Sequence, residues 1–174
     1  AGYAARQLCV PFLGLYGACS TIAESILVGG MMVDGGFADT AACAASSHFS
    51  TAERQYRFPL EFGTTSPPTA QRTVTGAGCV LLSGMGPLAG APFSHVAVTQ
   101  ATIGRVVDLG ISDVSNMGAA MAPAAADTIL THLSDTFVDP SAYDLVVTGD
   151  LGKFGTQMLL SLLSEKGVDL TKRH

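Results

Sequence analysis

The chain has 174 residues, enough for one domain of ordinary size or two small ones with a hydrophobic core. Hydrophobic residues make up 48% of it and charged residues only 13%, which excludes an intrinsically disordered chain. The net charge of −5 comes from scattered acidic residues, so we expect no nucleic-acid partner. No uninterrupted apolar stretch reaches the roughly 18 residues of a membrane-spanning helix, so any membrane contact is predicted to be peripheral.

The first residues and the cysteines indicate the cellular compartment in which the protein is expected to reside. The chain begins at Ala1 without a charged and then apolar leader, so we expect no signal peptide and interpret it as a piece of a longer intracellular protein. Cys9, Cys19, Cys43 and Cys79 lie far apart, without a C-x-x-C pair or a histidine at ligand spacing. We therefore predict a reducing compartment, no metal site and no cofactor.

The first part of the chain is predicted to form a strand, a turn and a helix. Leu8–Ala18 is an apolar run that contains Pro and Gly, which is typical of a short buried strand before a sharp turn. Thr21 and Glu24 match a capping box. Apolar residues at helical spacing follow, and the predicted helix ends at Gly35 and Gly36. Gly29 and Gly30 inside this helix predict that it is buried and that another backbone packs closely against it.

The rest of the chain alternates between predicted strands and helices. The strands are Thr40–His48, Arg72–Gly84 with a glycine bulge, one or two strands within Ser94–Gly110, and Leu145–Val147. The helices run from Asn116 to Ser134 and from Phe154 to Gly167. This alternation, with strands that are apolar on both faces, indicates an α/β protein in which helices cover both sides of mixed sheets.

Cys19 is the strongest candidate for chemistry. It follows the first apolar run and stands two residues before the predicted capped helix. A thiol in that place meets the unsatisfied amides and the positive dipole end of the helix, which stabilise a thiolate. The same amides can receive an oxyanion or a ligand carboxylate. The alternative is that a crowded turn simply requires a small residue.

Polar residues follow the second predicted strand. Ser47 and His48 stand at its end, which is where ligands bind in α/β sheets. Arg54 lies in the following loop, and a guanidinium can hold a carboxylate through two parallel hydrogen bonds. These three residues are therefore candidates for binding an anionic ligand. The alternatives are a solvent-exposed or capping histidine, and an arginine that pairs with Glu53 or Glu61.

Two further places offer ligand-binding groups. Asn116 precedes a predicted helix and presents side-chain and backbone donors, although a plain N-cap role is the more common explanation for such a residue. Gly149 and Asp150 follow the predicted strand Leu145–Val147, and their alternative is an ordinary turn. All three remain candidate ligand-binding residues.

Five segments carry a resemblance to a known family: YGACSTIAES, SSHFSTAERQYRFP, TGAGCVLL, NMGAAMAPAAADT and DLVVTGDLG. Over nearly the whole chain, they resemble the stage V sporulation protein AD family of the thiolase-like superfamily. The resemblance implies a layered α/β/α/β/α fold with mixed sheets, built of two similar halves and incomplete in this chain. Residues 1–92 would be the C-terminal part of the first half, and residues 93–174 the start of the second half.

The resemblance also implies roles for residues. Cys19 matches the nucleophile of thiolases and ketoacyl synthases. Those condensing enzymes carry a catalytic histidine at the end of a strand that corresponds to Asp144–Asp150, and no histidine stands there in this sequence. Condensation would lack its usual partner for proton transfer and oxyanion stabilisation, so we expect a protein that is not an enzyme.

The function that the resemblance implies is binding of dipicolinic acid (pyridine-2,6-dicarboxylate), in support of its uptake into developing spores. It further implies a homodimer that lies peripheral to the spore inner membrane and contacts channel subunits there. Two alternatives remain open: an acyl-transfer enzyme that uses Cys19 as its nucleophile, and a dimeric scaffold for the membrane partners.

Overall fold

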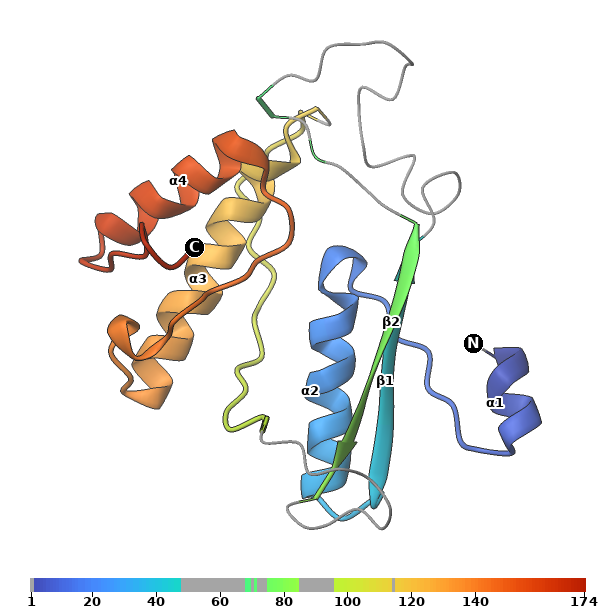
Figure 1. Cartoon of the computed structure of the whole chain (residues 1–174). Coiled ribbons are helices and arrows are strands. Elements are labelled where there is room, and N and C mark those ends of the chain that lie inside the picture. Colours follow the sequence, from blue (N-terminus) through green and yellow to red (C-terminus); the bar gives the residue numbers. More distant parts are fainter. Residues whose placement is uncertain (1, 48–67, 70, 72–74, 85–95, 114) are drawn as a thin grey trace. The chain divides into compact units, whose positions relative to one another are not determined.

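The structure is a computed structural model that describes residues 2–47, 68–69, 71, 75–84, 96–113 and 115–174 (Figure 1). The chain divides into two compact units. The first consists of Ala1–Ala45 and Gly78–Phe93, and the second of Ser46–Ala77 and Ser94–His174. Each unit has its own helices and its own packing.

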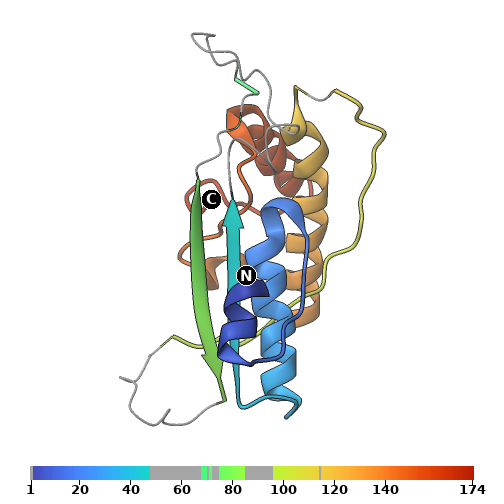
Figure 2. The ribbon, with the colours of Figure 1, turned by 90° about the vertical axis from the view of Figure 1, so that its right-hand side faces the viewer.

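The first unit is a two-stranded sheet with a helix packed on it. Its elements are α1 (Gly2–Leu8), the 3₁₀ turn η1 (Ala18–Ser20), α2 (Thr21–Asp34), β1 (Thr40–Ser47) and β2 (Gly76–Ser83). β1 and β2 pair and run in opposite directions (Figure 2). Burial alternates along β1, and Cys43 is its buried residue. The predicted α/β class is confirmed, as are the helix that begins at Thr21 and the strand that begins at Thr40.

Gly29 sets the distance between α2 and the sheet. A Cβ at this position would lie 2.5 Å from the Cys43 sulfur and 3.4 Å from both the Ala41 Cβ and a Leu82 methyl group. The close approach predicted for the glycine pair is therefore confirmed at Gly29, although side chains rather than backbone make the contact. It is wrong at Gly30, which has nothing within 4 Å. Gly29 is the one buried residue of α2, so the prediction of a helix buried all round is also wrong.

The predicted strand Leu8–Ala18 is not formed. Residues 10–17 have no regular secondary structure, and Phe12 and Leu13 are more than half exposed. A strand needs a neighbour to pair its backbone N–H and C=O groups. In the part of the chain that the structure describes, the sheet contains β1 and β2 and no third strand.

The second unit is built on two helices that lie against each other. It contains α3 (Met117–Thr136), the 3₁₀ turn η3 (Pro140–Ala142) and α4 (Gly152–Ser164) (Figure 1). Gly167 has a φ of 79°, the left-handed conformation that ends a helix, so both the predicted helices and the predicted stop after α4 are confirmed. Six apolar residues form the core of this unit: Ala122, Ala126, Leu151, Leu159, Leu163 and Leu170.

The first turns of α3 and α4 touch through two glycines. A Cβ on Gly118 would overlap the Leu151 carbonyl oxygen and lie 3.0 Å from the Gly155 Cα. A Cβ on Gly155 would lie 2.8 Å from the Gly118 Cα. The two backbones therefore meet directly, which fixes the starts of both helices beside each other.

Two other predicted strands of the second unit are wrong. Residues 96–110 contain no strand, and Leu145–Val147 lies outside any strand as well. Leu145 and Val147 are 68% and 78% exposed, while the Val146 amide donates to the Arg173 carbonyl at 2.8 Å. Alternation of apolar side chains is present here, but no described segment supplies the ladder that makes an extended stretch a strand.

The contact between the helix starts gives a direct test. Gly118→Ala is expected to lower the free energy of unfolding by about 2–3 kcal/mol, because the added methyl group overlaps backbone atoms that cannot rotate away. Gly30→Ala is the matched control: it adds the same methyl group in open space inside α2, and is expected to stabilise by about 0.5–1 kcal/mol. Urea unfolding followed by far-UV circular dichroism measures both. Similar effects of the two substitutions would contradict the direct backbone contact.

Candidate functional site

Cys19 lies in a tight turn that leads the chain into α2. It is the middle residue of η1, and its side chain is exposed. Ala18 before it has a φ of 49°, a left-handed conformation that costs a non-glycine residue about 1–3 kcal/mol. Ser20 is the N-cap residue of α2, and its side chain makes no capping hydrogen bond. The structure thus places Cys19 at a strained turn beside first-turn amides that no N-cap side chain satisfies.

The predicted capping box is wrong. Because η1 precedes α2, Ser20 rather than Thr21 takes the N-cap position. The Thr21 hydroxyl accepts from the Gly17 amide at 3.1 Å and donates to an η1 carbonyl at 2.8 Å. Oε2 of Glu24 is buried and has no hydrogen-bond partner among the described residues. It lies over Gly17, where a Cβ would be 2.7 Å away, so the turn holds an unsatisfied carboxylate oxygen.

Three of the predicted site residues belong to the end of β1 and the segment after it. Ser47 is the last residue of β1, as the prediction of a strand end requires. His48 and Arg54 lie outside the residues that the structure describes, as do Glu53 and Glu61. The roles proposed for His48 and Arg54 therefore stay predictions.

Asn116, Gly149 and Asp150 lie around the paired starts of α3 and α4. Asn116 is the N-cap residue of α3, and its side-chain oxygen accepts from a first-turn amide at 3.2 Å. The Asp150 carboxylate accepts from the Gly152 amide at 2.9 Å, at the start of α4. The structural alternatives considered for Asn116 and Asp150, a cap and a turn, are thus both present in the fold.

Gln71 reaches the same place and was not predicted. Its side-chain amide donates to the Asp150 carbonyl and lies 3.6 Å from the Met121 sulfur. Nearby in the sequence, the Pro68 carbonyl accepts from the Phe154 amide of α4 at 3.4 Å. A glutamine in a Pro-rich turn has no periodic signal, so only the tertiary contact reveals it.

A histidine approaches the end of the stretch Asp144–Asp150 from elsewhere in the chain. His174 Nε2 lies 3.0 Å from the Thr148 hydroxyl, which itself donates to the Gly149 carbonyl at 2.9 Å. Thr148 therefore accepts from Nε2–H, and a neutral ring keeps an unprotonated Nδ1. That Nδ1 is buried and has no hydrogen-bond partner among the described residues. The sequence pattern tests only for a histidine within the stretch, so it missed this one.

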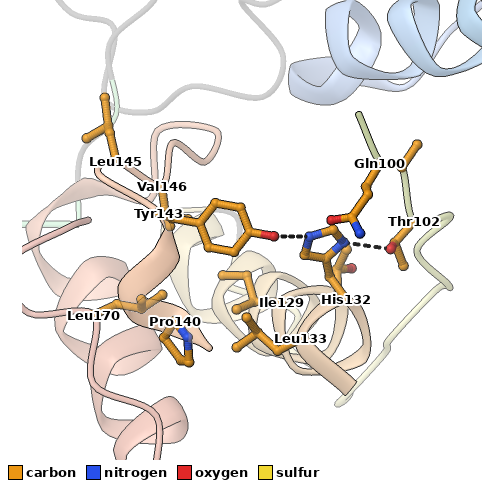
Figure 3. A pocket seen from close by; sticks show the side chains of 12 residues that line it. Gln100, Thr102, Ile129, His132, Leu133, Pro140, Tyr143, Leu145, Val146 and Leu170 are labelled. Atoms are coloured by element: carbon orange, nitrogen blue, oxygen red, sulfur yellow. Dashed lines mark hydrogen bonds between the residues drawn. The ribbon is translucent and has the colours of Figure 1, made fainter. Parts of the chain in front are cut away.

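A pocket of about 300 Å³ opens beside α3 (Figure 3). One side of it is a hydrogen-bonded chain in which His132 Nδ1 lies 2.8 Å from the Thr102 hydroxyl and Nε2 lies 2.7 Å from the Tyr143 hydroxyl. Sequence analysis singled out none of these three residues, because they come from three separate segments. The apolar wall of the pocket is formed by Ile129, Leu133, Pro140, Leu145, Val146 and Leu170.

Two carboxylates of the second unit are held by hydrogen bonds outside the pocket. Arg105 donates two hydrogen bonds to the Asp127 carboxylate, at 2.9 and 2.6 Å, and this lowers the pKa of Asp127. The Ser115 hydroxyl lowers the pKa of Asp113 in the same sense. A lowered pKa in the folded state stabilises the fold above the unfolded pKa, and that stabilisation is lost as pH falls through the folded value. Asp127 ties α3 to Arg105, Asp113 fastens a turn, and neither belongs to the pocket lining.

The sheet-packed α2 with Cys19 at its start and the paired α3 and α4 make this chain an α/β protein. All 174 residues match the family Stage V sporulation protein AD, and the chain belongs to that family. It is 47% identical over 174 residues to Stage V sporulation protein AD of Bacillus subtilis (strain 168). The match covers 100% of this chain and 49% of that relative, so the chain spans about half of the relative's length. Membership of this family gives the chain a role in spore formation.

Neither a membrane-spanning helix nor a metal-binding cluster occurs in the described residues. None of the helices in those residues is both long enough and apolar enough to cross a membrane. The same residues contain no group of three or more His, Cys, Asp or Glu side chains that could hold a metal ion.

The capping role of Asn116 can be separated from a ligand role. Asn116→Ala is expected to lower the free energy of unfolding by about 1 kcal/mol, because the first turn of α3 loses its side-chain acceptor. Asn116→Asp keeps an acceptor in the same place and is expected to retain wild-type stability. Thermal unfolding of both variants at neutral pH checks this. Equal stability of Asn116→Ala and wild type would show that the hydrogen bond contributes nothing to the fold.

Proposed function

We propose that this chain is part of a non-catalytic binding protein for dipicolinic acid, which supports uptake of this compound into developing spores. Family membership supplies the process, because the chain belongs to a family of spore-formation proteins. The ligand comes from the sequence resemblance. The observation that carries the proposal is the exposed Cys19 turn at the start of α2.

The Cys19 turn has the features that a carboxylate site needs. The Ser20 side chain accepts no hydrogen bond from the first-turn amides of α2, and the start of a helix favours an anion. The positive φ of Ala18 holds the thiol in one place at an energetic cost, and such strain is concentrated at functional sites. A dicarboxylate ligand could place one carboxylate on these amides, with the Cys19 thiol beside it.

Glu24 is the group that opposes an anion at this turn. Its carboxylate has a buried, unpartnered oxygen beside Gly17, on the same turn as Cys19. A negative charge on Glu24 repels a dianion bound at the same turn, and this repulsion limits the affinity for the ligand. Removal of the Glu24 charge is therefore expected to raise the affinity for the ligand, whereas loss of a contact lowers it.

We also propose that the protein acts as a homodimer, lies peripheral to the spore inner membrane and contacts channel subunits there. These proposals rest on the family resemblance. A monomer in light scattering at high protein concentration would contradict the homodimer.

Calorimetric titration with dipicolinate tests the proposed ligand. Saturable heat is expected, with weaker or absent heat for benzene-1,3-dicarboxylate, which keeps both carboxylates but lacks the ring nitrogen. Cys19→Ala is expected to weaken dipicolinate binding roughly three- to tenfold, the effect of losing one hydrogen bond. Glu24→Gln is expected to strengthen it by a similar factor, because the opposing charge is gone.

Two substitutions serve as matched controls for this titration. Cys9→Ala removes another exposed thiol, and Glu165→Gln removes a charge at the end of α4; neither is expected to change the affinity. No saturable heat in the wild type would refute the proposed ligand. Equal effects of Cys19→Ala and Cys9→Ala would refute the proposed site.

A second candidate function is acyl transfer through Cys19, and the exposure of its thiol at the start of α2 favours it. The thiolate form of cysteine is a strong nucleophile, and the exposed Cys19 side chain is open to an acyl donor. In that reaction the Cys19 thiolate attacks the thioester carbonyl of an acyl-coenzyme A. A thioester to Cys19 forms, the bond to coenzyme A breaks, and its thiolate leaves and takes up a proton.

Mass spectrometry after incubation with acetyl-coenzyme A distinguishes the two functions. Acyl transfer predicts an added acetyl group that is absent in Cys19→Ala and retained in Cys9→Ala. An unmodified mass after prolonged incubation is the result expected for a binding protein.

A further inference from the structure

The pocket beside α3 is separate from every residue that the dipicolinate proposal uses. It is lined by residues of four segments of the second unit: residues 100–102, α3, residues 140–146 and Leu170. Its volume of about 300 Å³ is at the lower end of the range for small-molecule sites. Leu145 at its edge is 68% exposed, so the pocket is open to solvent.

The chain of Thr102, His132 and Tyr143 has one proton more than its own hydrogen bonds use. A neutral imidazole contributes one N–H and the two hydroxyls contribute one O–H each, whereas the chain contains two hydrogen bonds. If Nε2 carries the proton, it donates to Tyr143, Thr102 donates to Nδ1, and the Tyr143 proton is left over. If Nδ1 carries it, the Thr102 proton is left over instead. Either tautomer therefore leaves one hydroxyl donor available.

The surroundings of this donor favour an uncharged ligand. His132 is the one titratable group besides Tyr143 among the lining residues, and no Asp, Glu, Lys or Arg of the described chain belongs to the lining. Burial of a carboxylate or an ammonium without a counter-charge is costly, whereas a carbonyl oxygen needs one donor only. The opposite wall, with Ile129, Leu133 and Pro140, fits an apolar ring or branched chain (Figure 3).

We infer that this pocket is a binding site for a small, uncharged, largely apolar molecule of about one ring that carries a single carbonyl acceptor. The carbonyl oxygen accepts the surplus hydroxyl proton of the Thr102–His132–Tyr143 chain, and the apolar body lies against α3. The site does not depend on dipicolinate binding, because a dianion would meet no Lys or Arg counter-charge in this lining.

Two probes of the same shape test the inference on the full chain. Acetophenone carries the carbonyl and ethylbenzene lacks it. Both are titrated against protein with isotope-labelled tyrosine and histidine rings, and the NMR shifts of Tyr143 and His132 report binding. The wild type is expected to bind acetophenone roughly three- to tenfold more tightly than ethylbenzene, the effect of one neutral hydrogen bond.

Substitution of the donor completes the test. Tyr143→Phe and Thr102→Val each remove one of the two hydroxyls that can carry the surplus proton. The variant that lacks the donor is expected to lose most of the preference for acetophenone while still binding ethylbenzene, which also reports that the pocket is intact. Tyr3→Phe, at a residue that is 85% exposed, is the control and is expected to keep the preference. No saturable shift with either probe, or equal affinity for both in the wild type, would overturn the inference even if Tyr143→Phe failed to fold. A preference unchanged in both folded variants, Tyr143→Phe and Thr102→Val, would overturn the role of the hydroxyl chain.

Discussion

Close packing in both units depends on helical positions that carry no side chain. Gly118 and Gly155 let the backbones of α3 and α4 touch, and Gly29 lets α2 lie against Cys43. Protein interiors are closely packed, with few voids. Here the packing is close because glycines, which have no side chain, let the neighbouring elements approach. The contact between Gly118 and Gly155 holds the starts of α3 and α4 together. It thereby also positions the polar residues around those starts.

Both polar sites, the Cys19 turn and the pocket beside α3, are built on these packed helices. At the start of α2, a 3₁₀ turn and the left-handed Ala18 present Cys19 to solvent. In the second unit, α3 supplies His132, while residues before and after the helix supply the hydroxyls of Thr102 and Tyr143. The family role in spore formation rests on the whole sequence. The proposed Cys19 site and the proposed ligand of the pocket rest on local geometry.

Helices were predicted better than strands, and the reason is physical. The three long helices were found because a helix satisfies its own backbone hydrogen bonds, so its period and its glycine stop signals are local. The strands expected at Leu8–Ala18, 96–110 and Leu145–Val147 have the right residues but no paired neighbour among the described residues. The capping box failed for a related reason, because a preceding 3₁₀ turn moved the N-cap by one residue to Ser20.

The sequence alone determined the α/β class, the positions of the long helices, the family and the location of Cys19 at a helix start. These depend on local spacing and on motifs read along one stretch of chain. Only the tertiary structure brought Gln71 to Asp150, His174 to Thr148, and Thr102 and Tyr143 to the two nitrogens of His132. Partners 11 to 79 positions apart leave no periodic trace in a sequence, because their meeting depends on how the helices pack.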